Sequence, residues 1–414
     1  MAFPDKDPHK TNQDTFSVLN KFLGEKEDSF FAVYDGHGPF GDECANFAKK
    51  DLPKSVNKFS KQIRVQKFKE TNDALPKEER LPFNPKLFPK LTAEEWEDVI
   101  QKAHIECNEK LVKKVSFTDS NGYDYQKHKL TMYSKFTLLF TLTIKPNSKL
   151  SGTTAISVLF SDGHIIVSNV GDSRAILGFR APADMSPSDL EYDVEEEKIE
   201  VSPAQDDEVV NFENNGASIF DEGKLYAIPL SSDQTPWRLD ERKRILKAGG
   251  RILTSDQMEG LEPVTNDWGD VVLGEDIDTE GTIPRVWLQD KDIPGTSFTR
   301  SIGDSIAESC GVNAEPEILK KRLYKNYEYL VIASDGVFEF LTNQTVIDIC
   351  DKCSDPLEAC EEIVKASYAE WLRHEDRTDD ITVIVFFMKN ETEIIHKSQD
   401  FNLIKSLAPK NIKK

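Results

Sequence analysis

The sequence lacks the features that mark membrane, secreted and nucleic-acid-binding proteins. No apolar run reaches a membrane-spanning length, and Met1 to Lys10 is too polar to act as a signal peptide. Only six of the 414 residues are cysteine, which favours reduced thiols over a disulfide framework. Basic residues are outnumbered 73 to 52, and the net charge of −21 opposes binding to nucleic acid or anionic lipid. We expect a monomeric cytoplasmic or nuclear protein with cations as its natural ligands.

Cysteine is also too sparse for a convincing zinc site. Cys350 and Cys353 form one C-x-x-C, with Cys360 nearby, but a closed zinc site usually needs four ligands. We expect these three thiols to pack on helices, with metal binding as the weaker alternative.

The sequence does contain short apolar runs that begin or end at acidic residues. Phe30 to Tyr34 has the composition of a buried strand, and it stops at Asp35-Gly36, where glycine permits a turn. Asp14 directly precedes a second short strand, Thr15 to Leu19. Taken alone, either carboxylate is equally ordinary turn chemistry. In neighbouring antiparallel strands, however, the end of one lies beside the start of the next, so both carboxylates are expected at one edge of a sheet.

The next region carries helix signals. Asp42 to Lys50 has a helical pattern that is expected to stop before Pro53. Residues from about 60 to 90 are rich in Lys, Glu and Pro, which predicts an insertion that runs over the surface. Thr92-Ala-Glu-Glu95 is a capping box, and it predicts a helix with one apolar face.

The clearest β pattern lies in the middle of the chain. Ala155 to Leu177 contains three short apolar runs separated by Gly- and Asp-containing turns, which predict a three-stranded meander. Insertions are expected on either side of it, at about 118–150 and 180–223, and the second is strongly acidic.

The C-terminal half repeats the alternation of helix and strand. A helix is predicted to begin at Thr235-Pro236, and Asn266 to Gly295 is expected to form a flap or long loop. Tyr329 to Ala333 is another apolar strand that ends near an Asp-Gly pair, Asp335-Gly336. Ile381 to Met388 is so apolar that we expect a central strand.

Acidic residues thus recur at strand boundaries. If these carboxylates gather at one edge of a β core, they repel one another unless a cation lies among them. Their oxygen ligands suit Mg²⁺ or Mn²⁺ better than Zn²⁺. Two such ions with a bridging water would generate hydroxide at neutral pH, and phosphate ester hydrolysis is the natural use. The residues are Asp14, Asp35, Asp172, Asp335 and Asp379, with Glu339 one helical turn after Asp335.

Six short motifs recur in a fixed order along the chain. They are Asn12-Gln13-Asp14, Asp35-Gly36-His37-Gly38, Ser151-Gly-Thr-Thr154, Gly171-Asp172-Ser173-Arg174, Ser334-Asp335-Gly336 with Phe338-Glu339, and Asp379-Asp380-Ile381-Thr382. This series resembles the metal-dependent Ser/Thr protein phosphatases of type 2C, the PPM family, over about residues 9–389.

The resemblance implies a fold and a reaction. The fold class is α+β, a four-layer α-β-β-α sandwich of two antiparallel sheets flanked by helices. The phosphatase domain would span residues 1–390 with the three insertions named above, followed by a Lys-rich tail at 391–414. The reaction would be hydrolysis of phosphoserine and phosphothreonine in phosphoprotein substrates, by a water or hydroxide that bridges two Mn²⁺ or Mg²⁺ ions.

The resemblance also implies roles for individual residues. Asp35 matches the ligand that bridges both metals, and the Gly36 carbonyl matches a ligand of the second. Asp335 and Asp379 match ligands of the first metal. His37 matches the candidate general acid that protonates the leaving Ser or Thr oxygen, with a structural imidazole in the turn as the alternative.

A second set of residues matches the surroundings of the metals. Gln13 and Asp14 match residues that hold metal-bound waters, and Asp172 and Glu339 lie where some relatives bind a weaker third metal. Two of these depart from the family pattern, because many relatives have Glu at Gln13 and Asp at Glu339. Gln13 carries no charge, which predicts weaker binding of the second metal.

The phosphate-binding arginine of some relatives is replaced by His9 or Lys10, and lysine is a point charge rather than a bidentate fork. The main alternative to an enzyme is a catalytically impaired relative that acts as a regulatory binding or scaffold protein. Other phosphoryl enzymes fit less well. The chain has no G-x-x-x-x-G-K-[ST] loop, and no cysteine is followed by five residues and then arginine.

Overall fold

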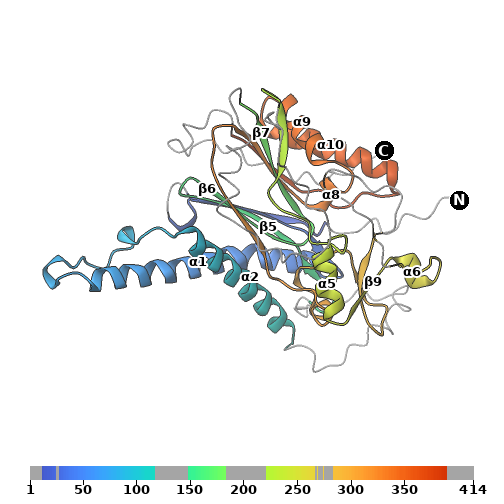
Figure 1. The fold of residues 1–414 in the computed structure, drawn as a ribbon, viewed down its shortest axis with the longest axis horizontal. Helices are drawn as coiled ribbons and strands as arrows, with labels where there is room; N and C mark the ends of the chain where they lie inside the picture. Colours follow the sequence, from blue (N-terminus) through green and yellow to red (C-terminus); the bar gives the residue numbers. More distant parts are fainter. Residues whose placement is uncertain are drawn as a thin grey trace, which may run out of the picture.

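The structure, a computed structural model, describes residues 12–24, 28–116, 148–182, 221–265, 268, 274 and 283–388 (Figure 1). The predicted tail 391–414, the candidates His9 and Lys10, and most of the expected insertions at 118–150 and 180–223 lie outside these residues. No helix among the described residues combines the length and apolarity needed to cross a membrane.

Two antiparallel sheets form the centre of the fold (Figure 1). The larger sheet contains, in spatial order, β1 (Thr15–Asn20), β2 (Ser29–Tyr34), β5 (Ala155–Ser161), β6 (His164–Val170) and β13 (Glu317–Arg322). The smaller sheet contains β15 (Val383–Phe387), β14 (Tyr327–Ala333), β7 (Arg174–Arg180) and β8 (Leu225–Pro229).

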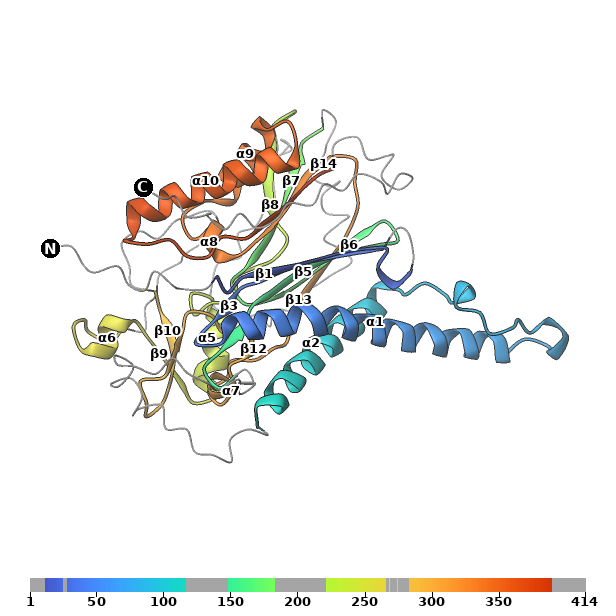
Figure 2. The same ribbon diagram turned by 180° about the vertical axis from the view of Figure 1, so that it is seen from behind.

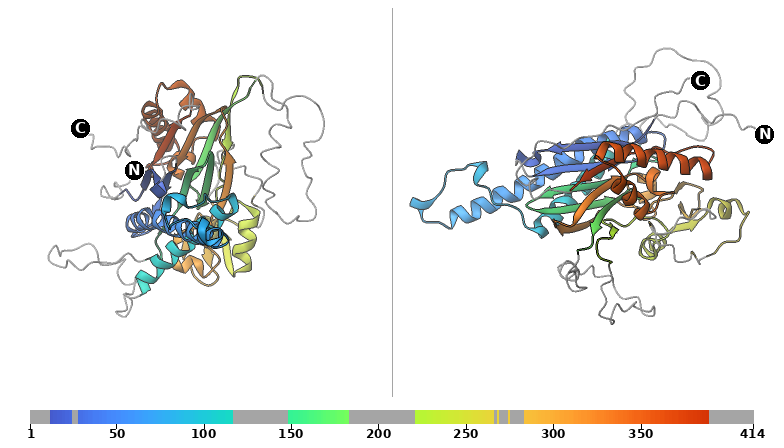
Figure 3. Two further views of the ribbon diagram at one scale, coloured as in Figure 1. Left: turned by 90° about the vertical axis from the view of Figure 1, so that its left-hand side faces the viewer. Right: turned by 90° about the horizontal axis from the view of Figure 1, so that it is seen from above.

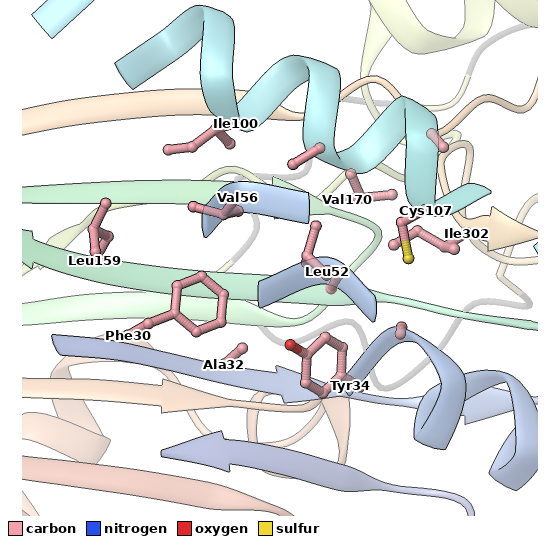
Figure 4. Packing of buried hydrophobic residues seen from close by; sticks show 14 of the residues in the cluster. Phe30, Ala32, Tyr34, Leu52, Val56, Ile100, Cys107, Leu159, Val170 and Ile302 are labelled. Carbon is pink, nitrogen blue, oxygen red and sulfur yellow. The ribbon is translucent and has the colours of Figure 1, made fainter. Parts of the chain in front are cut away.

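Strand β2 shows how the alternation of side chains builds two cores. Its even-numbered residues Phe30, Ala32 and Tyr34 pack toward the helices on the outer face, together with Leu52 and other apolar residues (Figure 4). Phe31 and Val33 point the opposite way, into the core between the two sheets. All residues of β2 are buried, which explains why its sequence is continuously apolar.

Helices cover both outer faces, as Figure 2 shows. On the larger sheet lie α1 (Gly41–Asp73) and α2 (Ala93–Ser116), and on the smaller sheet α8 (Asp335–Phe338), α9 (Asn343–Lys352) and α10 (Pro356–His374). The four layers confirm the predicted α-β-β-α sandwich. The capping box at the start of α2 is also present, since the Thr92 amide donates to Glu95 Oε2 at 2.7 Å and the Glu95 amide to Thr92 Oγ1 at 3.4 Å. Cys350, Cys353 and Cys360 pack in the core beneath α9 and α10, as expected.

Two smaller sheets complete the described fold. One joins β3 (Gly36–His37), β4 (Gly152–Thr153) and β12 (Ile302–Gly303). The other, which we call the flap sheet, consists of β9 (Gly250–Leu253), β10 (Arg285–Leu288) and β11 (Pro294–Thr296). The short helices α5 (Leu239–Lys247), α6 (Ser255–Glu259) and α7 (Ser305–Glu308) lie around the flap sheet (Figure 2).

The predicted end of the first helix before Pro53 is wrong. Helix α1 continues through Pro53 to Asp73, so the expected surface insertion at 60–90 is helical in its first part. Proline removes one N–H, which leaves the carbonyl of Lys49 without its usual helical donor. The Ser17 hydroxyl of β1 lies 3.5 Å from this carbonyl and supplies a replacement, which sequence reasoning could not foresee.

The predicted meander and the predicted central strand are also wrong. Strand β7 leaves the sheet of β5 and β6 and pairs with β14 and β8 in the other sheet. The crossing begins at Gly171, whose φ of +109° redirects the chain. Strand β15 lies at a sheet edge, and it is apolar because Ile384 faces the core between the sheets while Val385 faces the helical layer.

The start predicted for the helix in the flap region is wrong, and the region expected to form a flap or long loop contains strands. Helix α5 begins at Leu239 rather than at Pro236, whose carbonyl instead accepts from Arg242 Nη1 at 2.9 Å. The expected loop contains strands β10 and β11. Val286 of β10 is fully buried in the flap core, and the Trp287 indole donates to the Leu253 carbonyl at 2.8 Å.

Candidate functional site

The candidate carboxylates meet because the strand ends meet. Thr15 pairs with Tyr34, which sets Asp14 beside Asp35 at one end of the larger sheet. In the smaller sheet Ala333 pairs with both Arg174 and Val383, which brings the neighbourhoods of Asp172, Asp335 and Asp379 to one end of that sheet. The Ser334 hydroxyl donates to Asp14 Oδ2 at 3.0 Å and joins the two ends.

We call this group the strand-end cluster. Burial and repulsion between the carboxylates raise the pKa values of most of its members. Burial and the charges of Asp380 and Asp335 raise the pKa of Asp14 to about 7. Burial and the charge of Asp379 raise the pKa of Asp335 to about 6, and burial with neighbouring carboxylates raises that of Glu339 to about 7. The pKa values of Asp35 and Asp172 lie well above the ordinary value, mainly because of burial and secondly because of nearby carboxylates. The members of the cluster are Asp14, Asp35, Asp172, Asp335, Glu339 and Asp379.

Two observations show that the strand-end cluster fits a bound cation. Besides burial, the charges of Asp14 and Asp335 raise the pKa of Asp35, so these carboxylates lie close together and a cation among them would relieve their repulsion. Asp14 Oδ1 and Asp335 Oδ1 are buried without a hydrogen-bond partner. Such orphaned carboxylate oxygens are costly in a protein interior, and a hard divalent cation is the ligand that they suit.

The backbone around Gly36 leaves no room for a side chain at this position. A Cβ added there would lie 2.3 Å from the Gly41 carbonyl oxygen and 2.6 Å from that of Gln13. Any side chain would therefore displace the start of α1 or the segment before β1. This confinement explains why glycine follows Asp35.

Gln13 has a role in the structure that glutamate could not perform in its ionised form. Its Nε2 donates to the Gly38 carbonyl at 2.8 Å, and its backbone amide donates to Asp380 Oδ2 at 2.8 Å. An ionised glutamate offers only acceptors. The amide therefore holds the loop after β3 against the segment before β1.

His37 is held by a carboxylate that sequence reasoning did not single out. Its Nε2 lies 2.5 Å from Asp304 Oδ2, and its ring lies against Phe298 with the ring centroids 4.3 Å apart. Asp304 is 2 % exposed and also accepts from the Ser301 hydroxyl at 2.8 Å. The positive φ of Asp304, +49°, is uncommon for a residue other than glycine. The only sequence signal was an Asp after Gly303.

Asp233 and Arg285 are further residues near the cluster that sequence reasoning missed. The carboxylate of Asp233 receives two hydrogen bonds from the Arg174 guanidinium, at 2.9 and 2.6 Å, and its charge acts on Asp172 and Asp335. Arg285 reaches the cluster from the flap sheet. Burial lowers the pKa of Arg285, against the opposing charges of Glu339 and Asp172. Two serines separate Asp233 from the apolar run Leu225 to Leu230, and Arg285 is not acidic, so the search for strand-terminal acids missed both.

A second group of carboxylates lies elsewhere in the described structure. Ligand oxygens of Asp240, Glu241 and Glu317 lie within 4.8 Å of one another. Arginines pair with all of them: Arg238 bonds to Asp240 and Glu317, while Arg244 and Arg300 bond to Glu241. Burial alone would raise the pKa of Glu241, but the two arginines outweigh it and lower the pKa to about 2. We call this group the arginine-paired cluster, and its charge leaves no need for a metal.

Comparison with known proteins identifies the family. The family model described as "Protein phosphatase 2C" matches residues 86–185 and 215–374. "Probable protein phosphatase 2C 35" of Arabidopsis thaliana is 33% identical over 94% of this chain and 81% of its own length. "Probable protein phosphatase 2C 73" of Oryza sativa is 25% identical over 91% of this chain and 70% of its own.

A solved structure supports the same fold. The serine-threonine phosphatase 2C from Toxoplasma gondii superposes with a TM-score of 0.55 at 15% identity, covering 92% of this chain and 91% of that one. The family match, the Arabidopsis relative and this shared fold show that the chain belongs to the protein phosphatase 2C family, the metal-dependent serine/threonine protein phosphatases.

Proposed function

We propose that the chain hydrolyses phosphoserine and phosphothreonine in proteins with two divalent cations, Mn²⁺ or Mg²⁺, bound in the strand-end cluster. Asp35, Asp335, Asp379 and the Gly36 carbonyl would hold the two ions. The observation that carries this proposal is the charge of the cluster. Its carboxylates lie close together, and burial first and then their neighbours' charges raise their pKa values, which bound cations would offset.

When bound, the two ions supply activation of the attacking water and neutralisation of the phosphoryl oxygens. The chain's own residues do the rest. Asp14 and Gln13 border the ligands and would order nearby water, although the side chain of Gln13 is engaged with the Gly38 carbonyl. Asp172 and Glu339 would offer a weaker third position. Oxygen donors alone favour Mg²⁺ or Mn²⁺ over softer metals.

His37 would protonate the departing Ser or Thr oxygen. Asp304 occupies Nε2 of the ring at 2.5 Å, so Nδ1 would be the nitrogen that donates to the leaving group. Phe298 packs against the ring and limits its rotation. His9 or Lys10 would contribute a positive charge to the substrate phosphate. A monomeric state and a cytoplasmic or nuclear location remain predictions from the sequence.

The test is hydrolysis of p-nitrophenyl phosphate and of a phosphothreonine peptide by the full chain, first after chelation and then with Mn²⁺ or Mg²⁺ restored. We expect phosphate release only with metal, and loss of turnover in Asp335→Asn. Turnover that survives chelation, or a folded protein that stays inactive with both metals, would contradict the proposal and favour the catalytically impaired alternative.

A further inference from the structure

Residues 58–90 form a projection that we call the arm, and it joins the four layers where Phe59 and Ile63 pack against the core under α1 and α2. It consists of the C-terminal part of α1 and the segment that returns to α2, and it extends beyond the sheets (Figure 3). Thirty-three residues make α1 about 50 Å long, and its first residue, Gly41, lies against Gly36, next to Asp35 of the cluster, so the far end of the helix lies away from the proposed active site.

The arm has its own internal structure. The rings of Phe68, Phe83 and Phe88 contact one another with centroids 5.3 to 5.9 Å apart. Asn72 exchanges hydrogen bonds of 2.7 and 3.1 Å with the backbone of Leu81. These contacts fix the returning segment on α1, so a partner would meet a surface that is already ordered.

The end of α1 is closed in the same way. Arg80 donates to the carbonyl of Asp73 at 2.8 Å and to that of Leu75 at 3.2 Å, which satisfies acceptors that a helix end leaves free. Nearer the body, Arg64 donates to the Pro89 carbonyl at 3.1 Å. The returning segment is thus fastened at both ends.

This ordered segment exposes large apolar side chains. Leu81 is 49% exposed, Phe83 62% and Leu87 43%. They lie within seven residues of one another on a projection that already has its own aromatic contacts. Clustered exposed apolar groups rimmed by polar ones mark interaction surfaces, unlike apolar residues that are scattered singly.

The charge of the arm is opposite to that of the chain. Residues 58–90 contain nine Lys and Arg against four Asp and Glu, whereas the whole chain has 52 against 73. Lys61, Lys69, Lys77 and Lys86 are exposed, and their ammonium groups form no ion pair with the described residues. Lys77 precedes the exposed apolar side chains in the chain and Lys86 lies between Phe83 and Leu87, so the same segment offers apolar and cationic contacts.

The arm does not form a small-molecule site. An open hollow of about 590 Å³ runs along it, with all its lining residues, from Lys58 to Asp73, on α1. A single helix cannot enclose a ligand as a pocket does. The hollow is better suited to a chain laid along the helix.

We propose that the arm is a docking surface for an acidic polypeptide segment that also carries apolar side chains, supplied by a partner protein. Charge complementarity selects the acidic sequence, and Leu81, Phe83 and Leu87 select the apolar side chains. A membrane surface fits less well, because the remaining chain is strongly acidic and Glu78 and Glu79 interrupt the basic surface of the arm.

The test is fluorescence anisotropy of a labelled synthetic peptide in which Glu and Asp alternate with Leu and Phe, titrated with the full chain. A matched peptide carries Gln and Asn in place of the acids. We expect binding of the acidic peptide only, weakened roughly fivefold or more in Lys77→Glu/Lys86→Glu, since each reversed charge at a rim acts modestly. Leu81→Ser/Leu87→Ser should weaken binding as well.

Matched controls lie far from the arm. Lys243→Glu/Lys325→Glu reverses two exposed charges, and Leu246→Ser/Leu372→Ser removes two leucines that are 55% and 50% exposed. Both should bind the acidic peptide like the unaltered chain. Turnover of p-nitrophenyl phosphate should be unchanged in the arm variants, so binding is read independently of the proposed catalysis.

Four results would overturn the inference. The first is no binding of the acidic peptide, and the second is an equal loss in the control variants. The third is stronger binding to phosphatidylserine vesicles than to the peptide, with the same dependence on Lys77 and Lys86, which would assign the arm to membranes. The fourth is binding only after residues 183–220 are deleted, which would make the chain's own acidic segment the occupant.

Discussion

Two groups of acidic residues in this protein differ in how well nearby positive charges balance them. In the arginine-paired cluster, three guanidinium groups face Asp240, Glu241 and Glu317, and the pKa of Glu241 falls to about 2. In the strand-end cluster, the pKa of Asp14 rises to about 7 and that of Asp335 to about 6. Proximity of acidic residues therefore does not identify a metal centre, whereas missing countercharge does.

The largest expected effect comes from breaking the strand-end cluster. Asp335→Asn should lower turnover at least roughly 100-fold, because several kcal/mol of charge stabilisation depend on the bound ions. The measurement is steady-state hydrolysis of p-nitrophenyl phosphate at saturating Mn²⁺. Glu241→Gln is the matched control, and per folded molecule it should keep its turnover. Equal losses in both variants would erase the distinction between the clusters.

Breaking the arginine-paired cluster should affect stability instead. Arg300→Met leaves the buried Glu241 with one guanidinium partner fewer, at a cost of about 3 kcal/mol in the free energy of unfolding. Urea denaturation measures this cost. The increase in melting temperature caused by Mn²⁺ should be the same as in the unaltered chain, and a lost increase would place a metal at this cluster.

The two clusters should also respond to pH in opposite directions. Raised folded-state pKa values, as for Asp335 and Glu339, give stability that is present at low pH and lost as pH rises through about 6 to 7. The lowered pKa of Glu241 gives stability that is present above its ordinary value of 4.5 and lost as pH falls toward about 2.

Denaturation midpoints of the chelated protein across this range check both signs. Between about pH 5 and 8 the midpoint should fall without metal and stay level with Mg²⁺, since the bound ions replace the protons. A chelated protein whose stability rises over that interval would contradict the raised values.

A smaller effect on kcat is expected from changing Asp304, the carboxylate that contacts His37. Asp304→Asn should lower kcat about tenfold, because the ring of His37 loses its fixed orientation. Adding Asp304→Asn to His37→Gln should cost little more than His37→Gln alone. Steady-state kinetics of the two single variants and the double variant test this, and additive losses would show that Asp304 acts independently of His37.

The smallest effect is expected from deletion of Pro182 to Glu222. If the acidic segment is only an insertion, turnover of p-nitrophenyl phosphate should change less than about twofold. A collapse of activity in soluble, folded protein would mean that the segment supports the strand-end cluster.

The sequence predicted the strands and the strand-end acids because both depend on local pattern, whereas the four layers were implied by the family resemblance. The apolar run Phe30 to Tyr34 indicates a buried strand, and antiparallel pairing then places Asp14 beside Asp35. Sequence reasoning failed where the partner of a group lies far away in the chain. The donor that meets the Lys49 carbonyl comes from Ser17, and the partner of His37 comes from Asp304, 267 residues away.

Strand identity was predictable, but strand position was not. The apolar run of β15 indicates that both faces of the strand are buried. A strand at a sheet edge can also be buried on both faces when helices cover one of them. Likewise, the turn after β6 indicates a change of direction and not which sheet the next strand joins. The roles assigned to Asp35, Asp335 and Asp379 remain predictions, which the metal itself must test.

The most direct test of the difference between the clusters is anomalous X-ray diffraction from crystals grown with Mn²⁺. The account predicts two Mn²⁺ ions among Asp35, Asp335 and Asp379, and none at Asp240, Glu241 and Glu317. Mn²⁺ at the arginine-paired cluster, or an empty strand-end cluster at saturating Mn²⁺, would contradict the claim that missing countercharge marks the metal centre.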